Sequence, residues 1–140
     1  MSKELMQYFN KQPRLGTLST AGKDGKVNAA YFGSPAMTDE KTVSMGLGKN
    51  RTLQNLQENP NAVFMIMEPS EKMKDWKGVR VYLKMTECHT SGAKLDEKRA
   101  QIAKKVGAEA ANKMIQAALI FEVQEVRPIV DFGQGWEKSI

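Results

Sequence analysis

The chain has 140 residues, of which 41% are hydrophobic and 26% charged, and its formal net charge is +5. These values are ordinary for a globular protein, so we expect a single domain over residues 1–140. Cys88 and His89 are the only cysteine and histidine, which excludes an internal disulfide and leaves a Cys/His zinc site short of ligands.

The distribution of charge and apolar residues also bears on partners and location. Lysines and arginines are scattered and often alternate with acidic residues, which favours a mixed solvated surface over nucleic-acid binding. No apolar run approaches the roughly 20 residues of a membrane span. The N-terminus lacks the apolar core of a signal peptide. We therefore expect a cytoplasmic protein that binds neither nucleic acid nor membrane.

The first part of the chain predicts a helix, a hairpin and a third strand. Apolar residues recur at helical spacing over 2–10, which predicts a short helix with its apolar face on the core. Strands on either side of a glycine-rich turn at 19–25 predict a hairpin that ends near Phe32. After Pro35 a turn is expected at 38–41, and then a strand over 42–45.

The rest of the chain predicts a short helix before Pro60, strands over 62–67 and 79–85, a helix pair over 91–116 and a last strand over 117–126. The tail 128–140 is expected to be an ordered extension or a partner-binding strand. The methionines at 37, 45, 65, 67, 73, 85 and 114 are expected to fill the core. Together these elements predict a mainly β fold, a small closed or split β-barrel with few helices.

The segment 46–60 predicts an anion site between a strand and a helix. Its two glycines allow a ligand to approach the backbone, and Asn50 can cap the helix. Lys49, Arg51 and Thr52 bring two cationic groups and a hydroxyl to the first turn. The pattern is neither a Walker loop nor a dinucleotide fingerprint, so a phosphomonoester suits it better than a triphosphate. From these residues alone, a capped surface helix with solvated cations is an equal alternative.

Three blocks of this sequence resemble the FMN-binding split barrels related to pyridoxamine 5'-phosphate oxidase. They are Leu-Gly-Thr-Leu-Ser-Thr at 15–20, Gly-Lys-Asp-Gly with Val-Asn-Ala-Ala over 22–30, and Met-Gly-Leu-Gly-Lys-Asn-Arg-Thr at 45–52, the last followed by Asn59-Pro60. The resemblance covers about the first ninety residues, and the helical last third of the chain is more individual.

The resemblance implies a split β-barrel homodimer with FMN at the interface, acting as an oxidoreductase with a nicotinamide or a protein as electron donor. It implies phosphate contacts from Arg51 and Thr52, and ring contacts from the strands at 28–30 and 46–48. The residues that it implies for cofactor binding are Asn28, Ala29, Ala30, Gly46, Leu47, Gly48, Lys49, Asn50, Arg51, Thr52, Lys84 and Trp136.

The sequence departs from the oxidase at the substrate clamp. The oxidase holds pyridoxamine phosphate with an Arg and a His near its C-terminus, and residues 131–136 contain neither. Vitamin B6 oxidation is therefore not expected, and no catalytic residue is assigned. Two alternatives stay open: a non-enzymatic FMN-binding electron carrier or sensor, and a deazaflavin or haem bound in the same fold, with His89 as the one histidine for iron.

Overall fold

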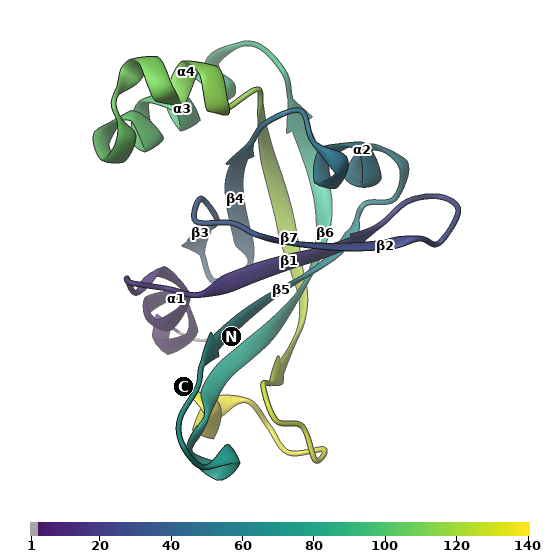
Figure 1. The fold of residues 1–140 in the computed structure, drawn as a ribbon, viewed down its shortest axis with the longest axis vertical. Coiled ribbons are helices and arrows are strands. Elements are labelled where there is room, and N and C mark those ends of the chain that lie inside the picture. Colours follow the sequence, from purple (N-terminus) through teal and green to yellow (C-terminus); the bar gives the residue numbers. More distant parts are fainter. Residues whose placement is uncertain (1–2) are drawn as a thin grey trace.

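The computed structural model describes residues 3–140, and seven antiparallel strands form one sheet within them (Figure 1). The strand order across the sheet is β2-β1-β5-β6-β7-β4-β3. The strands are β1 (Gly16–Ala21), β2 (Val27–Tyr31), β3 (Ala36–Asp39), β4 (Thr42–Leu47), β5 (Asn61–Glu68), β6 (Lys77–His89) and β7 (Ala117–Pro128).

The sheet curls because its two edge strands are neighbours in the chain. Only residues 32–35 separate the end of β2 from the start of β3, and such a link reaches at most roughly 18 Å. In a flat sheet of this order the two edges would lie roughly 29 Å apart. The sheet therefore closes on itself without pairing its edges, which confirms the predicted mainly β, split-barrel fold.

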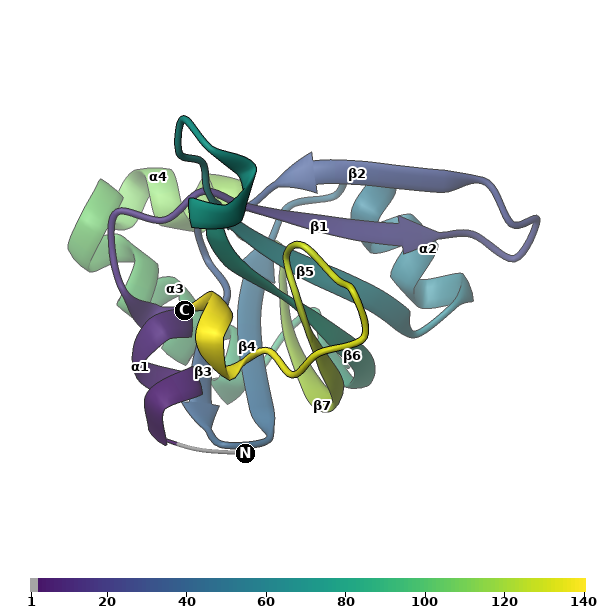
Figure 2. The same cartoon turned by 90° about the horizontal axis from the view of Figure 1, so that it is seen from below.

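Four helices and two short 3₁₀ turns pack around this sheet within the described residues (Figures 1 and 2). They are α1 (Lys3–Asn10), α2 (Arg51–Glu58), η1 (Met73–Asp75), α3 (Ala93–Val106), α4 (Ala108–Met114) and η2 (Glu137–Ser139). In Figure 1 the α3–α4 pair and α2 lie toward one end of the molecule, and the C-terminal tail lies at the other. No helix in residues 3–140 has the length and apolarity to cross a membrane.

The core lies inside the curled sheet and is closed by α1. Leu5 and Phe9 on α1 are fully buried, which confirms the predicted apolar face. The Phe9 ring lies 5.3 Å from that of Phe64 on β5. Asn10 then fixes the end of α1 to β3, because its amide exchanges two hydrogen bonds with the backbone of Met37, at 2.8 and 2.9 Å.

Two local predictions were wrong. The expected turn at 38–41 is partly strand, because β3 continues to Asp39 and pairs with β4. Met73 and Met114 are exposed rather than core residues, at 63% and 55%. The tail fits the first of its two expected forms, an ordered extension, since Trp136 packs against the core and a short 3₁₀ turn follows it. Pairing of the tail with a partner stays a prediction.

Candidate functional site

The start of α2 offers an anion two unpaired backbone donors. Asn50 is extended and its side-chain oxygen accepts a hydrogen bond from the Leu53 N–H at 2.9 Å, which confirms the predicted cap. Gln54 N–H donates to the Asn50 carbonyl at 3.1 Å. Within the described chain the N–H groups of Arg51 and Thr52 have no acceptor, as is usual for the first turn of a helix. The positive end of the helix dipole therefore lies at these two free N–H groups and faces outward.

Helix α2 is held on the β1–β2 hairpin by side-chain hydrogen bonds. Asn55 Nδ2 donates to Thr20 Oγ1 at 3.1 Å, and Glu58 accepts from the Lys23 N–H at 3.0 Å. Asn28 Nδ2 donates to Thr52 Oγ1 at 3.4 Å. The fold thus brings two predicted site residues together from separate sequence blocks. Thr52 is only 2% exposed, so its hydroxyl faces Asn28 rather than open solvent.

The two cations of the loop point in different directions. Lys49 and Arg51 are both exposed, and among residues 3–140 neither side chain forms a hydrogen bond or an ion pair. Arg51 lines a hollow beside the hairpin, together with two lysines and two acidic residues. Lys49 lines a separate hollow with Gln116. A phosphate at the helix start would therefore have Arg51, and not Lys49, on the side of the hairpin.

Gly46 in β4 and Gly48 just after it have a packing role that the sequence did not reveal. A Cβ at Gly46 would lie 2.9 to 3.1 Å from side chains of the α3–α4 region, and one at Gly48 would lie 2.9 Å from the Met114 carbonyl. Ser34 Oγ donates to the Gly46 carbonyl at 2.6 Å and accepts from its N–H at 3.3 Å. Small residues here let α3 and the segment around Met114 lie close against this strand end.

A cleft of about 860 Å³ runs from Asn50 along this strand end. Residues 31–36 form one wall, and α3 with the segment around Met114 forms the other. Gly46, Leu47 and Gly48 line its floor, so three predicted site residues share it with Asn50. The volume is within the range of sites for organic cofactors and substrates.

Lys98 on α3 is the residue of this cleft that sequence reasoning missed. Its side chain is 6% exposed, and its Nζ donates to Ser44 Oγ at 3.1 Å. Burial, with smaller contributions from Lys105 and Arg14, lowers the pKa of Lys98 to about 8. The sequence places Lys98 at helical spacing between Leu95 and Ile102. A lysine in a row of otherwise apolar residues was the signal that could have identified it as buried.

The other predicted residues lie elsewhere in the chain. Lys84 is exposed on β6 opposite Asn61, which follows the C-terminal end of α2 rather than its start. Trp136 lies with the tail near η2, at the far end of the sheet from α2 (Figure 1). Ala29 is exposed and Ala30 half-buried on the edge strand β2. The assignment of these residues to a cofactor stays a prediction, and for Trp136 it requires a second chain.

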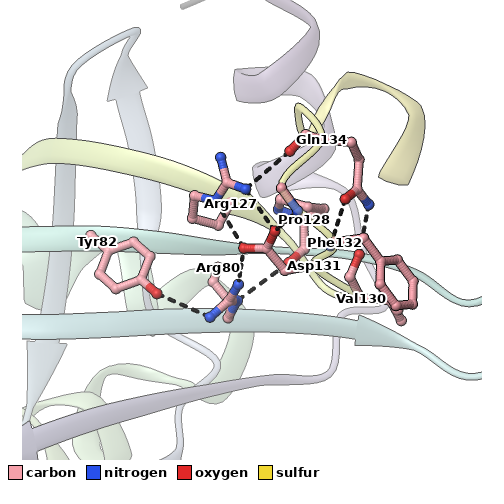
Figure 3. Close-up of polar contacts among 9 residues, drawn as sticks. Arg80, Tyr82, Arg127, Pro128, Val130, Asp131, Phe132 and Gln134 are labelled. Atoms are coloured by element: carbon pink, nitrogen blue, oxygen red, sulfur yellow. Dashed lines mark hydrogen bonds and ion pairs between the residues drawn. The ribbon is translucent and has the colours of Figure 1, made fainter.

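The tail is fixed to the sheet by two arginines that share one carboxylate (Figure 3). Asp131 lies 2.6 Å from Arg80 and 2.6 Å from Arg127, and Arg127 makes a second bond to it at 2.9 Å. Tyr82 accepts a hydrogen bond from Arg80 at 3.0 Å, so these two residues lie on the same face of β6. Hydrogen bonds from Arg127 and from a backbone N–H hold the pKa of Asp131 well below its usual range.

The Cys88–His89 pair does not form a reactive unit. Cys88 is exposed, while His89 Nε2 lies 2.8 Å from Glu87 Oε1 on the other face of the strand. Glu87 is also paired with Lys94 at 2.6 Å. Neither Cys88 nor His89 lines the cleft beside α3.

Comparison with known proteins identifies relatives by sequence and by fold. A family model described as pyridoxamine 5'-phosphate oxidase matches residues 2–129. No curated protein matches the chain. An FMN-binding protein from Syntrophomonas wolfei has 23% identity and a TM-score of 0.72, with 89% of this chain and 82% of that one covered.

Two further structures share the fold at lower identity. HupZ from Group A Streptococcus has 18% identity and a TM-score of 0.73, with 92% of this chain and 94% of that one covered. HutZ, described as the heme storage protein from Vibrio cholerae, has 16% identity and a TM-score of 0.63, with 94% and 98% covered. At such identities the likeness shows the fold, which accommodates both flavin and haem.

Proposed function

Because the chain belongs to the pyridoxamine 5'-phosphate oxidase family, we propose that it binds FMN at the start of α2 and acts as an FMN-dependent oxidoreductase. The observation that carries the proposal is the pair of acceptor-free N–H groups at Arg51 and Thr52, beside an Arg51 guanidinium with no partner in residues 3–140. Such a helix start suits a phosphomonoester. The FMN-binding protein from Syntrophomonas wolfei supports the choice of cofactor.

The residues around the helix start have distinct roles on this proposal. Arg51 and the two free N–H groups hold the phosphate, and Asn28 positions Thr52 at its edge. The floor formed by Gly46, Leu47 and Gly48 leaves room for a flat ring. Bound FMN would supply hydride or electron transfer, and the protein would supply its placement and its shielding from water.

We also propose that the protein is a homodimer with the flavin at the interface. The edge strand β2 exposes Val27 and Tyr31 at 83% and 61%, and these apolar side chains alternate on one of its faces. A second copy on this face would remove them from water. In this dimer the tail of each chain, which carries Trp136, lies close to the flavin bound by the other chain.

The first test is the visible absorption spectrum of the purified protein, with mass identification of the ligand that heating releases. We expect a flavin spectrum and release of FMN. A Soret band with no flavin, or a colourless protein that does not take up FMN, would contradict the proposal. Oxidation of NADH or NADPH in the presence of an acceptor then distinguishes an enzyme from the alternative carrier, for which only reversible reduction of the flavin is expected.

A further inference from the structure

Two buried cations lie in the same region of the fold without an acidic partner. Lys98 and Arg14 are 6% and 8% exposed, and neither forms an ion pair with any residue in 3–140. Arg14 is partly compensated, since it donates to the carbonyls of Phe9 and Gly33 at 2.8 and 3.2 Å, but its Nε has no acceptor in the described chain. Buried charges are normally paired or fully hydrogen-bonded.

Lys98 is the less satisfied of the two. Its ammonium has three donors, and the structure provides one acceptor, Ser44 Oγ. Its stem lies against Gly46, where an added Cβ would be 3.1 Å from the Lys98 Cγ. A residue that only filled space here would be apolar, because an uncharged side chain of similar length avoids the cost of burying an ammonium.

The cleft next to Lys98 is cationic, and its other lining residues are apolar or uncharged. Lys98 and Lys105 line it from α3, and no aspartate or glutamate is among its lining residues in the part of the chain described. Phe32, Ile102 and Met114 contribute apolar walls. The charge of Lys105 contributes, after burial, to lowering the pKa of Lys98. An anion between the two lysines would relieve this repulsion.

We propose that this cleft binds the compound that reacts with the flavin, and that this compound is an organic anion with a flat apolar body, such as an aromatic carboxylate, whose charge is met by Lys98 and Lys105. The inference rests on the proposed function, since it puts the anion beside a flavin held at the start of α2. Asn50 lies at that start and also lines the cleft, so one site leads directly into the other.

The test is calorimetric titration of the FMN-loaded protein with 2-naphthoate and with its neutral analogue 2-naphthamide. We expect the carboxylate to bind at least roughly tenfold more tightly than the amide, since a charge-assisted contact is lost in the amide. The flavin absorption spectrum should shift as naphthoate binds, because the ring and the anion share one cleft.

Three variants test whether Lys98 and Lys105 are the residues that bind the carboxylate. Lys98→Met removes the ammonium and keeps an unbranched stem, and Lys105→Met removes an exposed charge. Each should weaken naphthoate binding by roughly fivefold or more and leave naphthamide binding unchanged. Lys104→Met is the matched control, since Lys104 is exposed on the same helix and does not line the cleft.

Several results would overturn the inference. Naphthoate that does not bind, that binds no better than naphthamide, or that binds the Lys98 and Lys105 variants as it binds the wild type would remove the anion site. Naphthoate that binds the flavin-free protein but not the FMN-loaded protein would show that the flavin fills the cleft and leaves no room for the anion. A protein that takes up no FMN would refute the proposed function, and titration of that flavin-free protein would still test the lysines.

Discussion

Two groups of cations at opposite ends of the molecule are treated differently by the fold. At the tail end, Arg80 and Arg127 share the carboxylate of Asp131. At the other end, Lys49, Arg51 and Lys98 have no acidic partner in residues 3–140. The chain carries its own counter-ion where the cations hold the tail in place. It provides none for these three cations, for which we propose that FMN and its reaction partner supply the negative charge.

The largest effect is expected at the unpaired arginine. Arg51→Ala should weaken FMN binding by roughly 10- to 100-fold, because a charge-assisted contact to the phosphate is lost. Fluorescence titration of the flavin-free protein with FMN measures this. Riboflavin, which has no phosphate, should bind wild type and variant alike.

Lys104→Ala is the control for this loss, since it removes an exposed cation outside the site and should leave FMN affinity unchanged. An Arg51→Ala protein that binds FMN as the wild type does would place the phosphate elsewhere.

The cost of burying the unpaired Lys98 ammonium can be measured from the pH dependence of protein stability. Its pKa is lowered from 10.5 to about 8, so between these values the unfolded chain binds the proton that the folded chain has released. The free energy of unfolding should therefore rise with pH across this window, by about 3 kcal/mol at full effect. Below about pH 8 the folded protein carries the full cost of the buried ammonium.

Urea unfolding of wild type and Lys98→Met across this window tests the sign. Lys98→Met should lack the rise and be the more stable protein near neutral pH. The difference between the two proteins isolates Lys98, since every other side chain is common to both. Parallel curves would mean that the ammonium is solvated in the folded state.

The sequence anticipated the α2 end better than the α3 end, for a physical reason. The cap at Asn50, the stop before Pro60 and the period of the strands are local signals, and the structure confirms them. The burial of Lys98 arises only when α3 lies over Gly46, which is a tertiary contact that no local pattern specifies. Similarly β3 was missed because Pro35 and Asp39 are typical turn residues, and pairing with β4 overrides them.

At the tail end the carboxylate shared by the two arginines can be removed, and the expected loss is in local stability rather than in FMN binding. Asp131→Asn removes the shared carboxylate and leaves Arg80 and Arg127 without a counter-ion. We expect faster amide hydrogen exchange over residues 128–135 and a small loss of thermal stability, with protection in α2 unchanged. Lowering the pH below about 3.8 should progressively have the same effect in the wild type, because the folded-state pKa lies below the ordinary value.

The smallest effect is expected at Lys49, and it tests whether the structure already shows the arrangement that binds FMN. Lys49 faces the hollow beside Gln116, away from the hairpin side where Arg51 lies. Lys49→Ala should therefore weaken FMN binding by less than roughly threefold, as for a solvated surface charge. Fluorescence titration at low and high salt measures this, and the small loss should disappear at high salt. A loss as large as that of Arg51→Ala would mean that the loop closes on the phosphate and brings both cations to it. The loop that carries Lys49 and Arg51 would then move when FMN binds, whereas the tail is already fixed by Asp131 in the free protein.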